Sequence, residues 1–109
     1  MSLDIWLDKP AVEAMTVFDA NITHNLGKMA EEAKIYGVLW RPEEHEITHA
    51  WQLIEPLRGA IKEMKDDPGR FKKYDADNGW GTYKDFLLWL EELLVACVEY
   101  PEAIVRTSR

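Results

Sequence analysis

The chain has 109 residues, of which 47% are hydrophobic and 30% charged, and its formal net charge is -7. That length suits one domain covering residues 1–109, with enough apolar side chains for a modest core. The acidic balance argues against a nucleic-acid-binding face, which needs clustered Lys and Arg, and against attraction to anionic membranes. The single cysteine, Cys97, excludes an internal disulfide and is typical of a reducing compartment.

We expect neither a signal peptide nor a membrane-spanning segment. The N-terminal residues lack the basic stretch and apolar core of a signal peptide. The uninterrupted apolar runs are much shorter than the about 20 residues that a transmembrane helix needs. The sequence therefore predicts a soluble, cytoplasmic protein in which Cys97 packs as a small hydrophobic side chain.

The first predicted elements are β-strands. In SLDIWLD, apolar residues at positions 3, 5 and 7 alternate with residues 4, 6 and 8, which is the period of a half-buried strand. DKPAVEAM interrupts this pattern, and the β-type residues of TVFDA resume it. The two segments predict a hairpin or a pair of neighbouring strands.

Helical patterns follow these strands. Apolar residues at three- and four-residue steps predict one helix from Ile22 to Tyr36, which Gly37 ends. Pro42 suits the first turn of a further short helical piece. A second long helix is predicted from about Thr48 to Lys65, and Pro56 should kink or divide it.

The next segment, DDPGRFKKYDADNGWG, predicts a connector with one short helical turn from about Arg70 to Tyr74. Thr82 then fits the N-cap of a helix from Tyr83 to about Glu99, with Asp85 at the position of a capping-box partner. This helix should end before Pro101.

The last segment, EAIVRTS, has strand character and could pair with the N-terminal strands. The sequence therefore predicts an α+β fold, with about three main helices on a small three-stranded sheet made by the N-terminal strands and the C-terminal tail. The helices are apolar over wide arcs for so small a domain, a pattern that also fits a homo-oligomer.

The segment HEITH matches the zinc-hydrolase pattern H-E-x-x-H. In such enzymes two histidines one helical turn apart hold the metal, and the glutamate between them activates a metal-bound water. His45 and His49 have the spacing of the ligands, and Glu46 has that of the base. A minimal zinc hydrolase is therefore one hypothesis.

Several features weaken the zinc hypothesis. The extended pattern of one zinc-protease group fails, because Gln52 and Glu55 stand where Gly and His belong. His45 resembles the solvated start of a helix. Thr48 is a plausible N-cap, and a cap there would break the helix between the two histidines. The sequence therefore favours ordinary surface histidines in this segment.

A second constellation is NITHNL, in which Asn21, His24 and Asn25 crowd the predicted helix start. On a helical wheel, His24 falls opposite the apolar stripe. The favoured interpretation is that Asn21 or Thr23 caps the helix and that His24 is exposed. In the alternative, the first turn and these side chains form a small anion or ligand site.

The third constellation is NGWGTY, where two glycines around Trp80 permit unusual backbone angles. The favoured interpretation is a turn that folds Trp80 into the core and caps the following helix. In the alternative, Trp80 covers a pocket, with Thr82 and the N-terminus of the last helix as its polar floor. No Lys follows the glycines at the spacing of a P-loop.

Two longer stretches, NITHNLGKMAEEAKIYGVLWRPEE and QLIEPLRGAIKEMKDDPGRFKKYDADNGWGTYKDF, resemble a family of small, functionally uncharacterised proteins of bacteria and their phages. The likeness covers most of the chain from about Asp19 onwards. It implies no activity, but it implies that HEITH is a local variant, because the family keeps no histidine pair after LWRPEE. The motifs that carry the resemblance indicate these candidate site residues: Asn21, His24, Asn25, Trp40, Trp80 and Tyr83.

The leading hypothesis is a non-catalytic phage or prophage module without a cofactor, which binds a protein or a small molecule. If the two helix starts converge, Asn21, His24, Asn25 and Trp80 line one cleft. The alternatives are the zinc hydrolase and an acidic inhibitor that masks a basic surface of a host protein.

Overall fold

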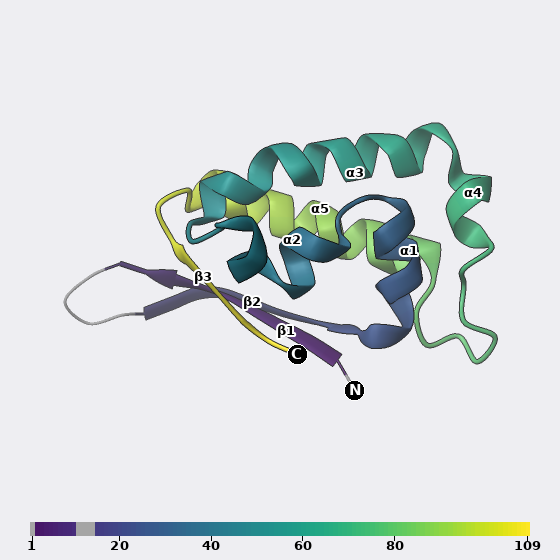
Figure 1. Cartoon of the computed structure of the whole chain (residues 1–109), viewed down its shortest axis with the longest axis horizontal. Helices are drawn as coiled ribbons and strands as arrows, with labels where there is room; N and C mark the ends of the chain where they lie inside the picture. The colour runs from purple at the N-terminus through teal and green to yellow at the C-terminus, as the bar shows by residue number, and fades with distance from the viewer. Residues whose placement is uncertain (1, 11–14) are drawn as a thin grey trace.

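The computed structural model describes residues 2–10 and 15–109 and contains a three-stranded antiparallel sheet in the order β2–β1–β3 (Figure 1). The predicted α+β class and the sheet of two N-terminal strands and the C-terminal tail are confirmed. Part of the predicted interruption, residues 11–14, lies outside the described residues. The strands are β1 (Ser2–Lys9), β2 (Met15–Thr23) and β3 (Ile104–Ser108).

The alternation in the first strand separates two faces of the sheet. Leu3, Ile5 and Leu7 are fully buried beneath the helices. On the opposite face, the guanidinium of Arg106 lies 4.1 Å from the ring centre of Trp6 and its Nε donates to Asp8 over 2.8 Å. The period of two in the sequence therefore corresponds to one core face and one polar face.

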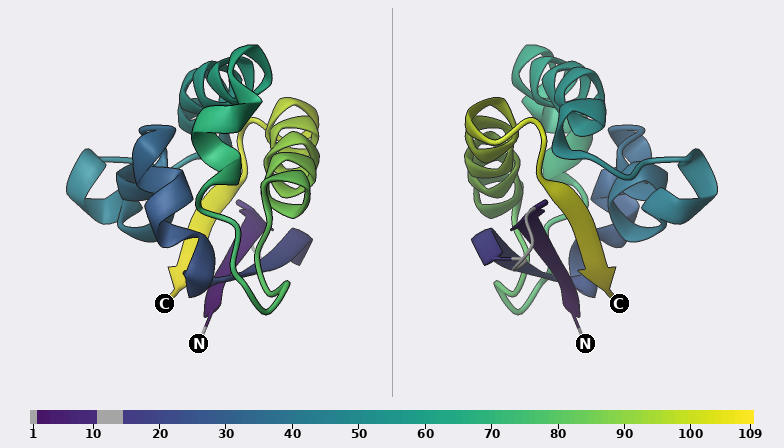
Figure 2. Two further views of the ribbon diagram at one scale, coloured as in Figure 1. Left: turned by 90° about the vertical axis from the view of Figure 1, so that its right-hand side faces the viewer. Right: turned by 90° about the vertical axis from the view of Figure 1, so that its left-hand side faces the viewer.

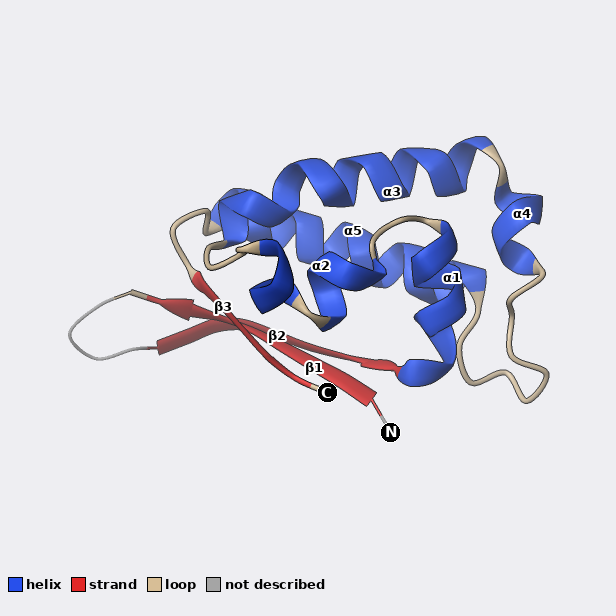
Figure 3. Ribbon diagram, in the orientation of Figure 1, coloured by secondary structure: helices blue, strands red, loops and turns tan. Residues whose placement is uncertain are grey.

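All helices lie on the core face of the sheet (Figure 2; Figure 3). α5 lies above β2, α1 and α2 lie above the other side, and α3 packs against α5 farther from the sheet. The α-helices are α1 (Gly27–Glu32), α2 (Tyr36–Trp40), α3 (Ile54–Asp66), α4 (Pro68–Lys72) and α5 (Tyr83–Glu99), and the 3-10 turns are η1 (His24–Leu26), η2 (Pro42–His45) and η3 (Ala50–Leu53).

The predicted helix from Ile22 to Tyr36 is wrong at both ends. β2 continues to Thr23, because Ile22 pairs with Leu3 and buries its side chain on the core face. Lys34, at φ 60°, interrupts the helical path, so α1 and α2 are separate. Gly37 lies inside α2 and ends nothing. A Cβ there would meet the exposed imidazole of His45, which would have to shift.

The predicted helix from Thr48 to Lys65 is also divided, but not by a kink at Pro56. The backbone N–H groups of Ala50 and Trp51 donate to the segment before β3. The 3-10 turn η3 therefore precedes α3 in the chain, and α3 begins at Ile54. Pro56 then lies in the first turn of α3, where its missing N–H leaves no helical bond unmade.

The last helix agrees closely with the sequence prediction. Thr82 caps α5, its Oγ1 accepting from the N–H of Asp85 over 3.2 Å. Phe86, Leu90 and Leu93 are fully buried in the core, whereas the opposite side of α5 leaves apolar side chains exposed (Leu88, Val95 and Val98). The predicted self-association would depend on that exposed side.

No helix within residues 2–10 and 15–109 is both long and apolar enough to cross a bilayer. Cys97 is buried, as predicted, and burial raises the pKa of its thiol to about 12. A thiol with that pKa is protonated at neutral pH and does not act as a nucleophile.

Candidate functional site

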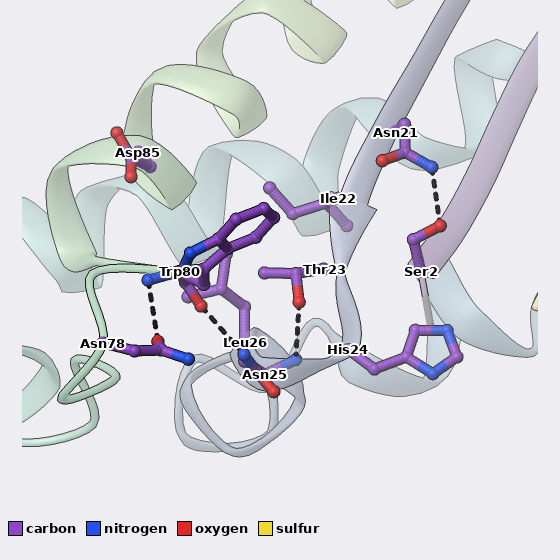
Figure 4. A pocket seen from close by; sticks show the side chains of 11 residues that line it. Ser2, Asn21, Ile22, Thr23, His24, Asn25, Leu26, Asn78, Trp80 and Asp85 are labelled. Carbon is purple, nitrogen blue, oxygen red and sulfur yellow. Dashed lines mark hydrogen bonds between the residues drawn. The ribbon is translucent and has the colours of Figure 1, made fainter.

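A pocket of 680 Å³ lies where the end of β2 and the turn η1 meet the loop before α5 (Figure 4). Two segments about 55 residues apart in the sequence therefore form one site. The pocket is lined by eleven residues: Ser2, Asn21, Ile22, Thr23, His24, Asn25, Leu26, Asn78, Trp80, Gly81 and Asp85.

Gly81 lets the loop backbone come close to the end of β2. It has a φ of 114°, a conformation that L side chains rarely adopt. An ideal Cβ at Gly81 would lie 3.1 Å from Cγ of Leu26 and 3.1 Å from Cγ2 of Thr23. The second glycine of NGWG is therefore required both for its backbone angle and for the contact between the two segments.

Three hydrogen bonds fix this junction. The Asn25 side-chain amide donates to the carbonyl of Trp80 over 3.0 Å, which links η1 to the loop. The Trp80 N–H donates to Oδ1 of Asn78 over 2.9 Å. The hydroxyl of Thr23 accepts from the Asn25 N–H over 3.2 Å and so caps η1. The backbone on both sides of the pocket is thus held by its own polar side chains.

The Trp80 side chain is 71% exposed although its backbone is held by these bonds. The prediction that the turn folds Trp80 into the core is therefore wrong. The prediction that the turn caps the next helix is confirmed at Thr82. In Figure 4 the indole lies between Asp85 and the end of β2. Gly79, at φ 77°, and Gly81 direct the chain so that Trp80 points outward.

His24 lies on the wall between two pockets and is half-buried, so the prediction of an exposed histidine is wrong. Its ring points away from Trp80 in Figure 4 and meets the Trp40 ring edge-on, with ring centres 6.2 Å apart. Its Nε2 is buried without a hydrogen-bond partner among the described residues. His24 therefore contributes a wall to the first pocket, with its imidazole turned toward Trp40.

The second pocket, of 400 Å³, is centred on the stacked rings of Tyr36 and Trp40, whose centres are 4.9 Å apart. Two of its cations already have carboxylate partners. Arg41 pairs with Glu44 at 3.3 Å, and Arg109 pairs with Glu43 at 2.8 Å.

Two predicted site residues lie outside the first pocket. Trp40 is 2% exposed and stacks on Tyr36. The Tyr83 hydroxyl donates to the carbonyl of Met64 over 2.8 Å, and the Tyr83 N–H donates to Asp75. The structure thus brings Asn21, His24, Asn25 and Trp80 to one pocket, whereas Tyr83 joins α5 to α3 and the connector.

The HEITH segment is not helical between its histidines. His45 ends η2, Glu46 has a left-handed φ of 57°, and His49 has an extended backbone as the N-cap of η3. The motif needs both imidazoles on one face of a helix, and that arrangement is not formed. Among residues 2–10 and 15–109, no three His, Cys, Asp or Glu side chains cluster closely enough to hold a metal ion.

The side chain of Gln52 stabilises the HEITH turn. Its Oε1 accepts from the N–H groups of Thr48 and His49, over 2.7 and 2.9 Å, and its Nε2 donates to the carbonyl of Glu46 over 2.9 Å. The predicted break in the helix therefore exists, but the N-cap is His49 and not Thr48. The carbonyl of Thr48 accepts from Val105, which ties the turn to β3.

The first pocket has little charge. Its lining includes no Lys or Arg, and Asp85 supplies its single carboxylate. The other polar side chains are neutral amides and hydroxyls, together with His24. Such a lining gives directional hydrogen bonds without a strong electric field.

Sequence reasoning missed Ser2 and Asp85 as lining residues. Ser2 belongs to the pocket because it pairs with Thr23 across the hairpin and accepts a hydrogen bond from Asn21 over 2.8 Å. The register between β1 and β2 places Ser2 there, and the alternation within each strand does not by itself give that register. The sequence indicates only a capping role for Asp85 at the start of α5.

No protein-family model matches the chain, and neither a curated protein nor a solved structure matches it. The resemblance to phage and bacterial proteins therefore stays a prediction.

Proposed function

We propose that this protein is a non-catalytic binding module that holds a small ligand in the pocket between the end of β2 and the loop before α5. The observation that carries the proposal is the exposed Trp80 beside neutral polar side chains, on a backbone that hydrogen bonds hold in place. Tryptophan is enriched at binding interfaces, and a pocket that combines apolar area with a few well-placed polar groups is the usual form of a ligand site.

Binding is favoured over catalysis because the pocket has no matched acid and base. Its lining includes two titratable side chains, Asp85 and His24. The His24 imidazole points away from Trp80 and toward Trp40. General acid–base catalysis needs a group within hydrogen-bond reach of the reacting atom, and Nε2 of His24 is buried.

The fixed backbone also favours binding energetically. Asn25, Asn78 and Thr23 already hold the main chain on both sides of the pocket. A ligand would therefore order few protein groups on binding, which lowers the entropic cost of association.

The proposal is tested by ligand-observed NMR with a mixed library of neutral, acidic and basic small molecules. We expect compounds that bind the wild-type protein to lose their signal with Trp80→Ala and to keep it with Trp51→Ala. Trp51 is a matched control because its side chain is also exposed, at 55%, and does not line the pocket. If no compound binds, or if Trp80→Ala binds as well as the wild type, the proposal is wrong.

A further inference from the structure

The chemistry of the same pocket points to one class of ligand. We infer that it takes a neutral polyhydroxylated molecule, a saccharide, with one face of a sugar ring on the indole of Trp80. This inference rests on the proposed binding function and adds the ligand class to it.

Charge is the first argument. An anionic ligand would need a cation in the pocket, but none of the eleven lining residues is Lys or Arg, and the chain as a whole carries a net charge of -7. A quaternary ammonium ligand is typically enclosed by a cage of several aromatic rings. Here Trp80 is the single large aromatic side chain in the lining. A neutral ligand suits this environment better than either ion.

Hydrogen-bonding capacity is the second argument. Asn21 and Asn25 each use Nδ2 to bond the protein, so each retains a side-chain oxygen as an acceptor. Asn78 uses Oδ1 to accept from Trp80, so its Nδ2 remains a donor. Asp85 adds a carboxylate acceptor. A hydroxyl group both donates and accepts, so neighbouring sugar hydroxyls can satisfy this mixed set.

The third argument is the position of Trp80 relative to those amides. The backbone N–H of Trp80 bonds to Asn78, and its backbone carbonyl bonds to Asn25. The remaining amide atoms of these two side chains are available to bond a ligand. The C–H groups on one face of a sugar ring are apolar and can cover an indole face. The hydroxyls at the edge of that ring can then meet the flanking amides. An exposed indole on a backbone held by two amide side chains provides both kinds of contact together.

The test is a titration of ¹⁵N-labelled protein, followed by two-dimensional NMR, with three kinds of probe. The neutral probes are glucose, galactose, mannose, N-acetylglucosamine and their short oligomers; the cationic probe is choline, and the anionic probe is inorganic phosphate. We expect one or more neutral probes to shift the Trp80 indole N–H and the Asn78 side-chain amide in a saturable way. The Trp51 indole N–H serves as the internal control and should not move.

Two variants separate the ligand classes. Trp80→Ala should weaken binding of the neutral probe by at least about tenfold, because an aromatic anchor is lost. Asp85→Asn should change it by less than about threefold, since an amide oxygen can replace a carboxylate as acceptor for a hydroxyl. A cationic ligand would depend strongly on that carboxylate and on salt concentration.

The outcomes are distinguishable. Saturable shifts with a neutral probe, insensitive to salt, support the inference. Binding of choline or phosphate alone at these residues overturns the saccharide class and leaves the proposed binding function standing. If none of these probes shifts Trp80 or Asn78, the saccharide inference is wrong. If the mixed library also yields no compound that depends on Trp80, the proposed function is wrong as well.

Discussion

The end of β2 and the HEITH segment are both short, histidine-bearing stretches that leave regular secondary structure, but they obtain their partners differently. At the end of β2, Asn25 bonds to the carbonyl of Trp80, 55 residues away in the sequence, and a pocket lies between the two segments. In HEITH, the N–H groups of Thr48 and His49 and the carbonyl of Glu46 bond to Gln52, which is three to six residues away. The long-range bond of this segment, from the Val105 N–H to the Thr48 carbonyl, joins backbone to backbone and ties the turn to β3.

This difference separates a motif from a site. HEITH has the residue types of a zinc centre, but its left-handed Glu46 and extended His49 place the two imidazoles off any common helix face. NITHNL has no recognised catalytic spacing, yet the fold places the exposed indole of Trp80 and the amide of Asn78 beside it. Side-chain chemistry becomes a site only where the backbone brings the right groups together.

The largest expected effect concerns Gly81, which holds the two pocket segments together. We expect Gly81→Ala to lower the free energy of unfolding by about 2–3 kcal/mol, because of its positive φ and the close contacts with Thr23 and Leu26. Urea denaturation followed by circular dichroism measures this. Gly59→Ala is the matched control: Gly59 lies in α3 with open space around it, and alanine there should stabilise by about 0.5–1 kcal/mol. Equal effects at both positions would contradict the close contact.

The next effect concerns the HEITH turn. Gln52→Ala should destabilise the protein by about 1–2 kcal/mol, since it leaves the N–H groups of Thr48 and His49 without their acceptor. Gln52→Glu keeps the acceptor and should recover part of the loss.

The same denaturation experiment, repeated with one equivalent of zinc, should give an unchanged free energy of unfolding. Stabilisation by zinc that His49→Ala abolishes would revive the metal hypothesis.

A smaller effect is expected at the cap of α5, next to the pocket. Thr82→Ala should cost about 1 kcal/mol, because the Asp85 N–H loses its acceptor, and Thr82→Ser should restore most of it. Thr82 does not line the pocket. Ligand affinity at Trp80 should therefore be unchanged in both variants, and a large loss of affinity would show that the cap and the pocket are not separable.

The smallest effect lies at Asp8, at the end of β1 that is farther from the pocket. Hydrogen bonds from Arg106 and then Thr16 hold the pKa of the Asp8 carboxyl below its usual range. Because the pKa of Asp8 is lower in the folded state than the unfolded value of about 3.9, its ionised carboxylate stabilises the fold at pH values above about 3.9. That stabilisation is lost as the pH falls through the folded-state pKa. Asp8→Asn should thus be less stable at pH 7 by less than about 1 kcal/mol. The difference should shrink below about pH 4 in thermal melts. A constant difference at all pH values would contradict the pairing.

Much of the fold was predictable because strong local signals agreed with tertiary packing. The alternation at Leu3, Ile5 and Leu7 gave a strand with one buried face, and Thr82 with Asp85 marked the start of α5. In both places the pattern that governs local structure is the same pattern that builds the core.

Elsewhere tertiary contacts overrode the local pattern. Ile22 fits a helical stripe, but its pairing with Leu3 keeps it in β2. The residues before α3 fit a long helix, but their N–H groups bond to Pro101 and Ala103, near the other end of the chain. Such long-range bonds leave no signal in local periodicity.

The candidate site was predictable only in part, because each of its residues belongs to a local motif but its geometry depends on long-range contacts. Asn21, His24, Asn25 and Trp80 were identified from residue type and local crowding. The outward direction of Trp80 was not, since it depends on the positive φ angles of Gly79 and Gly81 and on the bond from Asn25. Trp40 and Tyr83 were grouped with the site by motif alone, and the fold places them against other partners.

The most direct test of the central claim is a chemical-shift map of the protein titrated with the best-binding small molecule. The account predicts that the shifts concentrate on the Trp80 indole and on the side-chain amides of Asn25 and Asn78, with the Trp51 indole unmoved. Shifts centred instead on the exposed side of α5, at Leu88, Val95 and Val98, would contradict a ligand pocket at the end of β2.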